Sequence, residues 1–203
     1  GVDPCTPSAE VCDGADNDCD GDTDEDGVCV PQNEAIYGEA LFDAAGTSDA
    51  DVDGDGTADV CARGAAGITC ALSGGGAPLS THFDTTSFAD GNGWDDVTNH
   101  ATLRLADVTG DGLADFCARA NAKLVCRPST GTGFGDLIGG PAWSDDAGWN
   151  KPAYYTTVRM ADVDGDGKAD ACARAAAGFR CHLSTGAGFS DAIAGDFFTD
   201  AQH

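Results

Sequence analysis

Residues 105–126 read LADVTGDGLADFCARANAKLVC, and residues 49–70 and 160–181 repeat this pattern. Its acidic part has the form D-x-D-x-D-G-x-x-D, once with a single substitution. In such a loop the odd positions turn their oxygens inward, glycine allows the bend, and the position-7 carbonyl and position-9 carboxylate complete the shell. Oxygen-only ligation favours Ca²⁺ over transition metals, which draw on His and Cys. The pattern therefore predicts calcium loops.

The nine-residue loop occurs four times, beginning at Asp16, Asp51, Asp107 and Asp162. Thr109 replaces the position-3 aspartate of the loop at Asp107, so we expect that site to be weaker or more hydrated. We expect about four calcium ions per chain. The candidate metal-binding residues are Asp16, Asp18, Asp20, Asp22, Asp24, Asp51, Asp53, Asp55, Thr57, Asp59, Asp107, Thr109, Asp111, Leu113, Asp115, Asp162, Asp164, Asp166, Lys168 and Asp170.

The chain of 203 residues carries 35 acidic and 10 basic side chains, for a formal net charge of −25. Its length allows one domain of ordinary size plus a small appendage. Such acidity argues against nucleic-acid binding, which requires basic faces. An acidic run is usually a solvated tail, but the fixed spacing and the glycine placement favour metal loops here. Without metal, each loop would concentrate three or four carboxylates, so we expect the fold to depend on the cation.

The ten cysteines are an even number without a C-x-x-C pair, which favours disulfides over zinc. Cys5, Cys12, Cys19 and Cys29 crowd the N-terminal segment and allow three connectivities. The other six form pairs nine residues apart, each closure contributing about 2.5–3 kcal/mol. These pairs are Cys61 and Cys70, Cys117 and Cys126, and Cys172 and Cys181.

Disulfides and calcium loops together predict a protein outside the cytoplasm, either secreted or at the cell surface. The sequence shows no signal peptide and no apolar run of membrane-spanning length. We therefore expect no membrane insertion, and we interpret the chain as a processed mature form or a fragment.

The loops at Asp51, Asp107 and Asp162 are 56 and 55 residues apart, a period typical of propellers and repeat arrays. Each unit is expected to contain short strands and no helix. Residues 103–106 and 158–161 lead into their loops, a strand with the first cysteine follows, and residues 124–127 return beside it. The cysteine pair then joins neighbouring antiparallel strands. A four-stranded sheet of this kind is a propeller blade, so we predict an all-β fold with three blades.

The units resemble FG-GAP or VCBS repeats, the integrin-type propeller module in which a calcium loop links two strands of a blade. The segments GWDDVTNHATLRL (93–105) and GWNKPAYYTTVRM (148–160), with the loop and the period, are most similar to propeller lectins of the Psathyrella velutina type. The resemblance covers residues 47–203. It is imperfect, since Pro78 stands where the later repeats have Phe134 and Phe189.

Residues 10–29 resemble a short metal-binding motif that is frequent in secreted proteins of myxobacteria and their relatives, which implies a bacterial source. The segment has no His or Met, so its own acidic loop favours calcium over copper. About thirty residues cannot fold on a hydrophobic core, so disulfides and metal must hold them. We predict a Cys-rich calcium-binding segment at 1–30, a linker or leading strand at 31–46, and repeats at about 47–100, 101–157 and 158–203.

The lectin resemblance implies a non-catalytic extracellular recognition or adhesion module that binds carbohydrate between adjacent blades. Aromatic faces stack on sugars, while Arg and Asn bond to hydroxyls. A Trp repeated at fixed register is, however, more often inter-blade core, and the recurring Arg residues could instead pair with loop acids. The candidate ligand-binding residues are Trp94, Trp149, Tyr154, Tyr155, Arg119 and Arg174.

Propellers have typically four to eight blades, so three loops leave both edges of the array incomplete. Exposed sheet edges promote pairing, and we expect a homo-oligomer or polymer, with a fragment of a longer propeller as the other interpretation. The alternative function is a self-assembling subunit of an extracellular filament, matrix or surface layer. Catalysis has little support, because the paired acids Asp95-Asp96 and Asp145-Asp146 lie in turn-forming connections.

Overall fold

The structure is a computed structural model that describes residues 34–36, 50–74, 82–195 and 197–202. The chain divides into two compact units, residues 1–34 and 35–203, and the repeats belong to the second. The predicted calcium-binding segment at 1–30, with its loop from Asp16 to Asp24 and the cysteines Cys5, Cys12, Cys19 and Cys29, lies outside the described residues.

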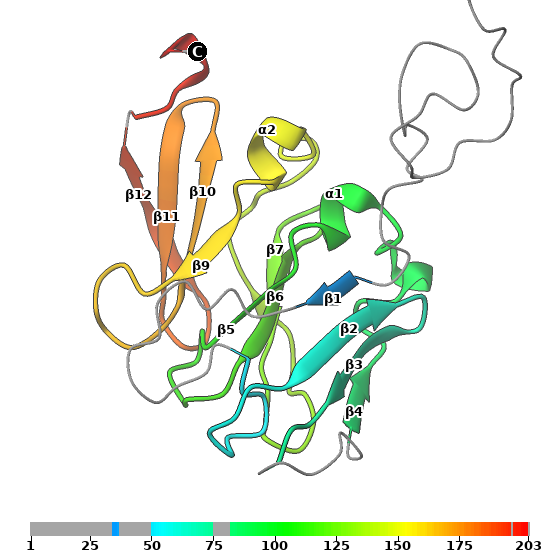
Figure 1. Cartoon of the computed structure of the whole chain (residues 1–203). Helices are drawn as coiled ribbons and strands as arrows, with labels where there is room; N and C mark the ends of the chain where they lie inside the picture. The colour runs from blue at the N-terminus through cyan, green and yellow to red at the C-terminus, as the bar shows by residue number, and fades with distance from the viewer. Residues whose placement is uncertain (1–33, 37–49, 75–81, 196, 203) are drawn as a thin grey trace, which may run out of the picture. The chain divides into compact units, whose positions relative to one another are not determined.

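Three four-stranded sheets follow one another along the chain (Figure 1). Blade 1 contains β1 (Glu34–Ile36), β2 (Val60–Gly64), β3 (Gly67–Ala71) and β4 (His82–Thr85). Blade 2 contains β5 (Arg104–Ala106), β6 (Asp115–Arg119), β7 (Leu124–Arg127) and β8 (Ile138–Gly139). Blade 3 contains β9 (Arg159–Ala161), β10 (Asp170–Ala175), β11 (Gly178–Ser184) and β12 (Phe189–Gly195). This is the all-β, propeller-like fold predicted from the repeats, and the described blades do not close a ring.

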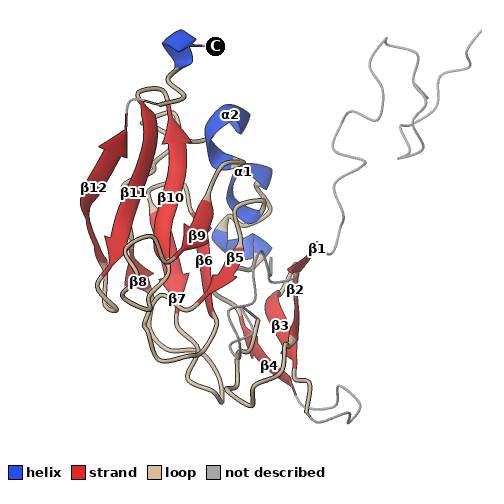
Figure 2. Cartoon of the chain, turned by 60° about the vertical axis from the view of Figure 1, so that its left-hand side comes forward, coloured by secondary structure: helices blue, strands red, loops and turns tan. Residues whose placement is uncertain are grey.

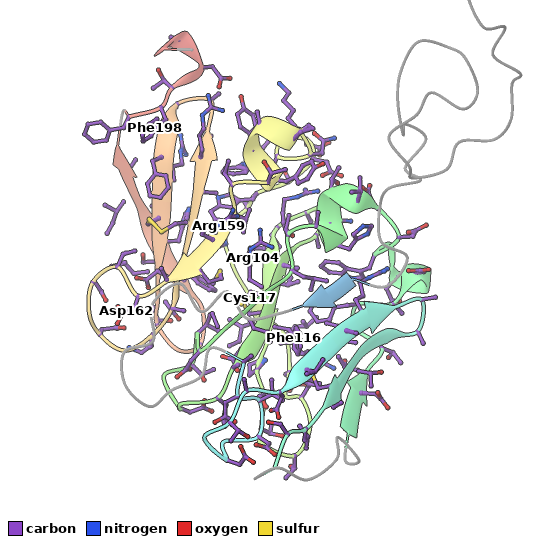
Figure 3. All side chains as sticks on the ribbon, in the orientation of Figure 1. Arg104, Phe116, Cys117, Arg159, Asp162 and Phe198 are labelled. Atoms are coloured by element: carbon purple, nitrogen blue, oxygen red, sulfur yellow. A yellow bond between two sulfur atoms is a disulfide. The ribbon has the colours of Figure 1, made fainter. Side chains whose placement is uncertain are left out.

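The cysteine pairs join the two middle strands of each blade, as predicted. Cys117 on β6 lies directly opposite Cys126 on β7 in an antiparallel register, and the two are bonded (Figure 3). The same register and bond occur between β2 and β3 and between β10 and β11. The three disulfides of the repeats are therefore confirmed.

The expectation of no helix is wrong. One-turn helices, α1 (Val97–His100) and α2 (Pro152–Tyr155), lie before β5 and β9, and 3-10 turns occur at Asp90–Asn92 and Asp200–Gln202. The Asp96 carboxylate accepts the Thr98 N–H at 2.8 Å and caps α1, while proline in the first turn of α2 has a backbone already suited to a helix. These turn-forming residues therefore start helices.

The core lies between successive blades, which Figure 2 shows one after another. The first cluster joins Val52, Ile68 and Phe88 of the first repeat to Leu103 and Phe116 of the second. A second cluster joins residues of blade 2 to residues of blade 3 in the same way. Burying a side chain of this size contributes about 1.5–3 kcal/mol, so these clusters are the main force that packs the blades.

Candidate metal centres and inter-blade joints

The first carboxylate of each acidic loop is the centre around which the loop curls. Asp51 accepts the backbone N–H groups of Gly54 at 2.6 Å and Gly56 at 2.8 Å. The equivalent bonds in the loops at Asp107 and Asp162 measure between 2.6 and 2.9 Å. Gly54 and Gly56 have φ angles of 82° and 85°, which side-chain-bearing residues rarely adopt, so the loop requires glycine there.

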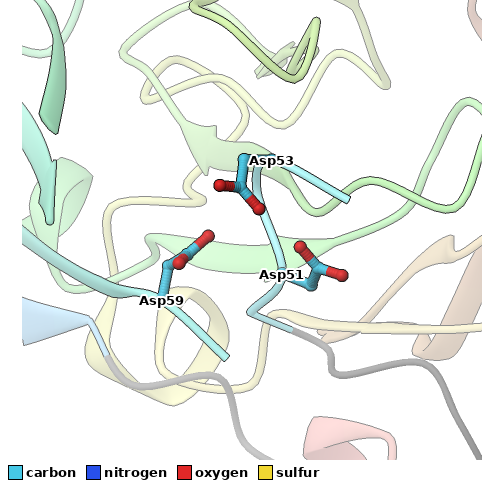
Figure 4. A group of neighbouring side chains, drawn as sticks. All are labelled: Asp51, Asp53 and Asp59. Atoms are coloured by element: carbon cyan, nitrogen blue, oxygen red, sulfur yellow. The ribbon is translucent and has the colours of Figure 1, made fainter. Parts of the chain in front are cut away.

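Two of the three repeat loops bring three carboxylates close enough to share one cation. In loop 1 (residues 51–59) these are Asp51, Asp53 and Asp59 (Figure 4), with one oxygen from each lying within 4.8 Å of the others. In loop 3 (residues 162–170) the group is Asp162, Asp164 and Asp166, also within 4.8 Å.

Loop 2 (residues 107–115) forms no such group among the residues that the structure describes. Its position-3 residue, Thr109, donates its hydroxyl to Asp107 Oδ1 at 3.2 Å. A hydroxyl therefore occupies the place of the third carboxylate, which is the feature from which the sequence predicts a weaker site.

The carboxylate at position 9 braces each loop against its own blade. Asp115 accepts the Val108 N–H at 3.0 Å and the Ser129 N–H at 2.8 Å, and it is fully buried. Burial raises the pKa of Asp115 to about 7; the two hydrogen bonds oppose this shift, and the charges of Asp107 and Asp111 add to it. Asp59 and Asp170 make the same pair of bonds at 2.7 to 2.9 Å. A bound cation would favour the charged form of such a carboxylate.

The loops differ in how they balance their own negative charge. Burial raises the pKa of Asp53 in loop 1, a backbone hydrogen bond from Asp55 opposes the rise, and neighbouring carboxylates add to it. In loop 3, Lys168 Nζ lies 2.5 Å from Asp166 Oδ2, which lowers the pKa of Asp166 and raises that of Lys168. Loop 3 therefore carries an internal ammonium, whereas the position-5 carboxylate of loop 1, Asp55, accepts from the neutral Thr57 hydroxyl and the Thr57 N–H.

The same loops form the polar joints between blades. The Ala114 N–H at position 8 of loop 2 donates to the Asp51 carbonyl of loop 1 at 2.7 Å, and Ser129 Oγ donates to the Val52 carbonyl. One repeat later, the Ala169 N–H donates to the Asp107 carbonyl at 2.7 Å, and Ser184 Oγ donates to the Val108 carbonyl at 2.5 Å. Loops 1 and 2 are thus each bonded to the blade that follows them.

Side chains at position 7 of the loops cover glycines of the preceding loop. A Cβ on Gly54 would lie 2.9 Å from Leu113 Cδ2, and a Cβ on Gly110 would lie 2.9 Å from Lys168 Cγ. Loops 1, 2 and 3 therefore contact one another in series. Ser129 and Ser184 are joint residues that the sequence patterns above did not predict, although their recurrence in Ser-Thr-Gly is a usable signal.

The aromatic residues predicted to bind sugar are buried in the structure. Trp94 packs edge-on against Phe88 with ring centroids 4.7 Å apart, and Trp149 stacks on Trp143 at 4.8 Å. Tyr154 and Tyr155 in α2 are buried as well. A buried ring offers no free face to a sugar, so the geometry favours the inter-blade core that the sequence left as the other interpretation.

The recurring arginines pair with acids of the long connections and not with the acidic loops. Arg63, Arg119 and Arg174 form ion pairs with Asp90, Asp145 and Asp200 respectively. Arg119 is fully buried. The three aspartates recur every 55 residues, which indicates that they share one role in the repeat. Asp145, one of the paired acids, thus has a structural partner.

The fold and its loops define a propeller-like array whose blades are joined at acidic loops. No protein-family model and no curated protein matches the chain. Among solved structures, an Agrocybe aegerita lectin described as recognising non-reducing terminal N-acetylglucosamine is similar over 75% of this chain, with a TM-score of 0.68 and 25% sequence identity. A Photorhabdus luminescens Tc holotoxin chain is similar over 85% of this chain, with a TM-score of 0.51 and 20% identity, which shows the fold alone.

This chain spans 39% of the lectin chain and 7% of the toxin chain. None of the helices in the described part of the chain has the length and apolarity that a membrane span requires.

Proposed function

We propose that this chain is a calcium-stabilised, non-catalytic recognition module of a secreted or cell-surface protein, built from FG-GAP-like blades, and that its ligand is carbohydrate. The observation that carries the proposal is the similarity to the Agrocybe lectin over 75% of this chain at 25% identity. That lectin is described as recognising non-reducing terminal N-acetylglucosamine, so glycans with this end group are the first ligands to test.

Calcium is the proposed cofactor, because the donor sets fit a hard cation. Loops 1 and 3 each offer three carboxylates and no nitrogen or sulfur ligand. Bound calcium would neutralise charge that the fold concentrates. The chain's own residues do the rest: the position-1 carboxylate curls the loop, and the position-9 carboxylate fixes it to its blade. Calcium in this proposal is a scaffold for the joints and takes no part in chemistry.

Arg174 is the first side chain to test for contact with a glycan. It is the most exposed of the six candidates, since the other five are buried. Its guanidinium carbon lies 5.6 Å from the centre of the Tyr154 ring, and its Nε donates to the Phe198 carbonyl at 2.8 Å. An arginine beside an aromatic ring can bond to sugar hydroxyls.

Binding to a broad glycan array, followed by calorimetry with a glycan ending in N-acetylglucosamine, tests this function. We expect a signal in calcium that is lost in chelator and restored when calcium returns. Arg174→Met should weaken binding, whereas Lys123→Met, which removes one charge from an exposed turn of blade 2, should not. An array without signal, obtained with protein that circular dichroism shows to be folded, would overturn the proposal.

The alternative function, a self-assembling subunit of an extracellular filament, matrix or surface layer, is favoured by one observation. Blade 3 exposes three large apolar side chains, Val163, Phe179 and Ile193. Electron microscopy of the purified protein with calcium and with chelator separates the two functions. Filaments that require calcium would support the structural subunit, and discrete small particles under both conditions would rule it out.

A further inference from the structure

Blade 3 exposes the apolar positions that blades 1 and 2 bury in their joints. The side chains at position 2 of loops 1 and 2, Val52 and Val108, are fully buried, but Val163 at the same position of loop 3 is 50% exposed. Two residues before the second cysteine, blades 1 and 2 have the buried side chains Ile68 and Leu124, whereas Phe179 at this position of blade 3 is 40% exposed. Ile138 of blade 2 packs against the second core cluster, whereas its counterpart Ile193 is 57% exposed. We call Val163, Phe179 and Ile193 the leading face of blade 3.

The backbone carbonyls of loop 3 also differ from those of loops 1 and 2. In loops 1 and 2 the carbonyls at positions 1 and 2 accept hydrogen bonds from the following blade. The corresponding carbonyls of Asp162 and Val163 receive no donor from a following blade among the residues that the structure describes. Asp162 lies at the outer edge of blade 3, on the side away from blade 2 (Figure 3). The leading face therefore combines uncovered apolar side chains with available acceptors.

Blade 1 carries the complementary groups. Blade 2 docks on blade 1 through the Ala114 N–H, the Phe116 side chain and Ser129 Oγ. The positions that align with these in blade 1 are Ala58, Val60 and Ser73. Ala58 is exposed, and Val60 is 39% exposed, although Phe116 in the same register is fully buried.

The Ser73 hydroxyl of blade 1 has to change its hydrogen-bond partner on docking. It donates to the Ala58 carbonyl of its own loop at 2.6 Å, whereas Ser129 and Ser184 reach the preceding blade. Rotation about one side-chain bond would redirect it. We call Ala58, Val60 and Ser73 the trailing face of blade 1.

We propose that the leading face of blade 3 in one copy docks on the trailing face of blade 1 in a second copy, through Val163 against Val60 and through hydrogen bonds from Ala58 N–H and Ser73 Oγ to the Asp162 and Val163 carbonyls. A second copy is the occupant that the chain itself specifies, because both halves of a joint that it forms twice internally are present and exposed. The contact is head to tail, so it closes a ring or extends as a filament. It does not depend on carbohydrate binding.

The charge of the chain sets the conditions for this docking. A net charge of −25 opposes the approach of two copies, and screening or calcium in loops 1 and 3 reduces that repulsion. We expect association to strengthen with calcium and with moderate salt.

Two single variants and their mixture test the proposal by sedimentation velocity in calcium. The unaltered chain should exceed the 20.4 kDa of one copy as its concentration rises. Val163→Asp places a charge in the leading face, and Val60→Asp places one in the trailing face. The self-association of each variant alone should be at least tenfold weaker than that of the unaltered chain, so each should sediment as a single copy. Mixed together, they retain one intact face of each kind and should form a two-copy complex that grows no further.

Leu137→Asp is the matched control, because Leu137 is an exposed apolar residue of blade 2 that the proposed joint does not use. It should associate like the unaltered chain. A single-copy mass for the unaltered chain at every concentration would overturn the proposal. So would association of either Asp variant alone at the unaltered strength, or the absence of a two-copy complex from the mixture when both variants unfold like the unaltered chain.

Discussion

Replacing Arg119 with methionine should destabilise the region where α1 meets the connection that precedes α2. The guanidinium is fully buried and donates to the Thr98 carbonyl, to Thr98 Oγ1 at 2.8 Å and to Asn99 Oδ1 at 2.9 Å. It also lies 2.5 Å from Asp145 Oδ1 and donates to the Trp143 carbonyl at 3.4 Å. Methionine keeps much of the stem but donates nothing.

The size of the effect follows from the acceptors that would lose their donor. The Asn99 amide oxygen and the Trp143 carbonyl belong to buried residues, and an unsatisfied buried acceptor costs about 1–3 kcal/mol. The Asp145 carboxylate is partly exposed and can be rehydrated, so its loss adds little. Since methionine regains some apolar packing, we expect the free energy of unfolding to fall by about 2–4 kcal/mol.

Urea unfolding in calcium measures this loss, and Arg174→Met is the matched control in the next repeat. Arg174 makes the equivalent ion pair with Asp200 at a more exposed position, so its replacement should cost less than about 1 kcal/mol. Equal stability losses for the two variants would refute the reasoning. If Arg119 instead served as a sugar ligand, Arg119→Met would retain its stability and lose glycan binding.

Three further outcomes are expected from urea unfolding. Ser129→Ala should lower the free energy of unfolding by about 1–2 kcal/mol, because it leaves the buried Val52 carbonyl of the preceding loop without its donor. Ser73→Ala should lower it less, because the Ser73 hydroxyl bonds to the partly exposed loop of its own blade, and equal losses would argue against the joint. Replacing both Cys117 and Cys126 with alanine should lower the free energy of unfolding by at least about 2.5 kcal/mol. An unchanged urea midpoint would argue against a structural role for this disulfide. The pKa of Asp115 is raised to about 7, so the folded state binds this proton more tightly than the unfolded state does. In chelator, the free energy of unfolding should therefore fall as pH rises from about 4 to about 7. In calcium this fall should be absent, and a fall of equal size in both conditions would contradict the assignment of Asp115 to a calcium loop.

The sequence was sufficient for features that are local or that repeat. The spacing of Cys117 and Cys126 predicts strands in direct register, and the structure has that register. The period of the acidic loops predicts blades, and three four-stranded sheets are present. The short helices α1 and α2 could not be predicted, because Asp96 and Pro152 are equally common in turns and at helix starts. Whether a turn or a helix forms there depends on how the segment packs before the next strand.

Contacts between distant parts of the chain could not be predicted from these patterns. Trp149 recurs at the same register as Trp94, and this spacing suits a sugar platform as well as a core; the stacking partner Trp143 decides in favour of the core. Arg119 meets Asp145 across 26 residues of connection, and Ser129 meets Val52 across 77. Such contacts depend on how one blade packs on the next, which local periodicity does not specify.

Calorimetric calcium titration, with thermal unfolding of the same sample, tests most directly the claim that the acidic loops bind calcium and thereby hold the blades together. We predict heat from at least two sites per chain and a higher unfolding temperature in calcium than in chelator, because one site at a hundredfold excess over Kd adds about 2.7 kcal/mol. Asp53→Asn, which keeps the hydrogen bond from the Asp55 N–H but removes one charge from loop 1, should weaken one site and reduce the stabilisation. No binding heat, together with the same unfolding temperature in calcium and in chelator, would contradict the account.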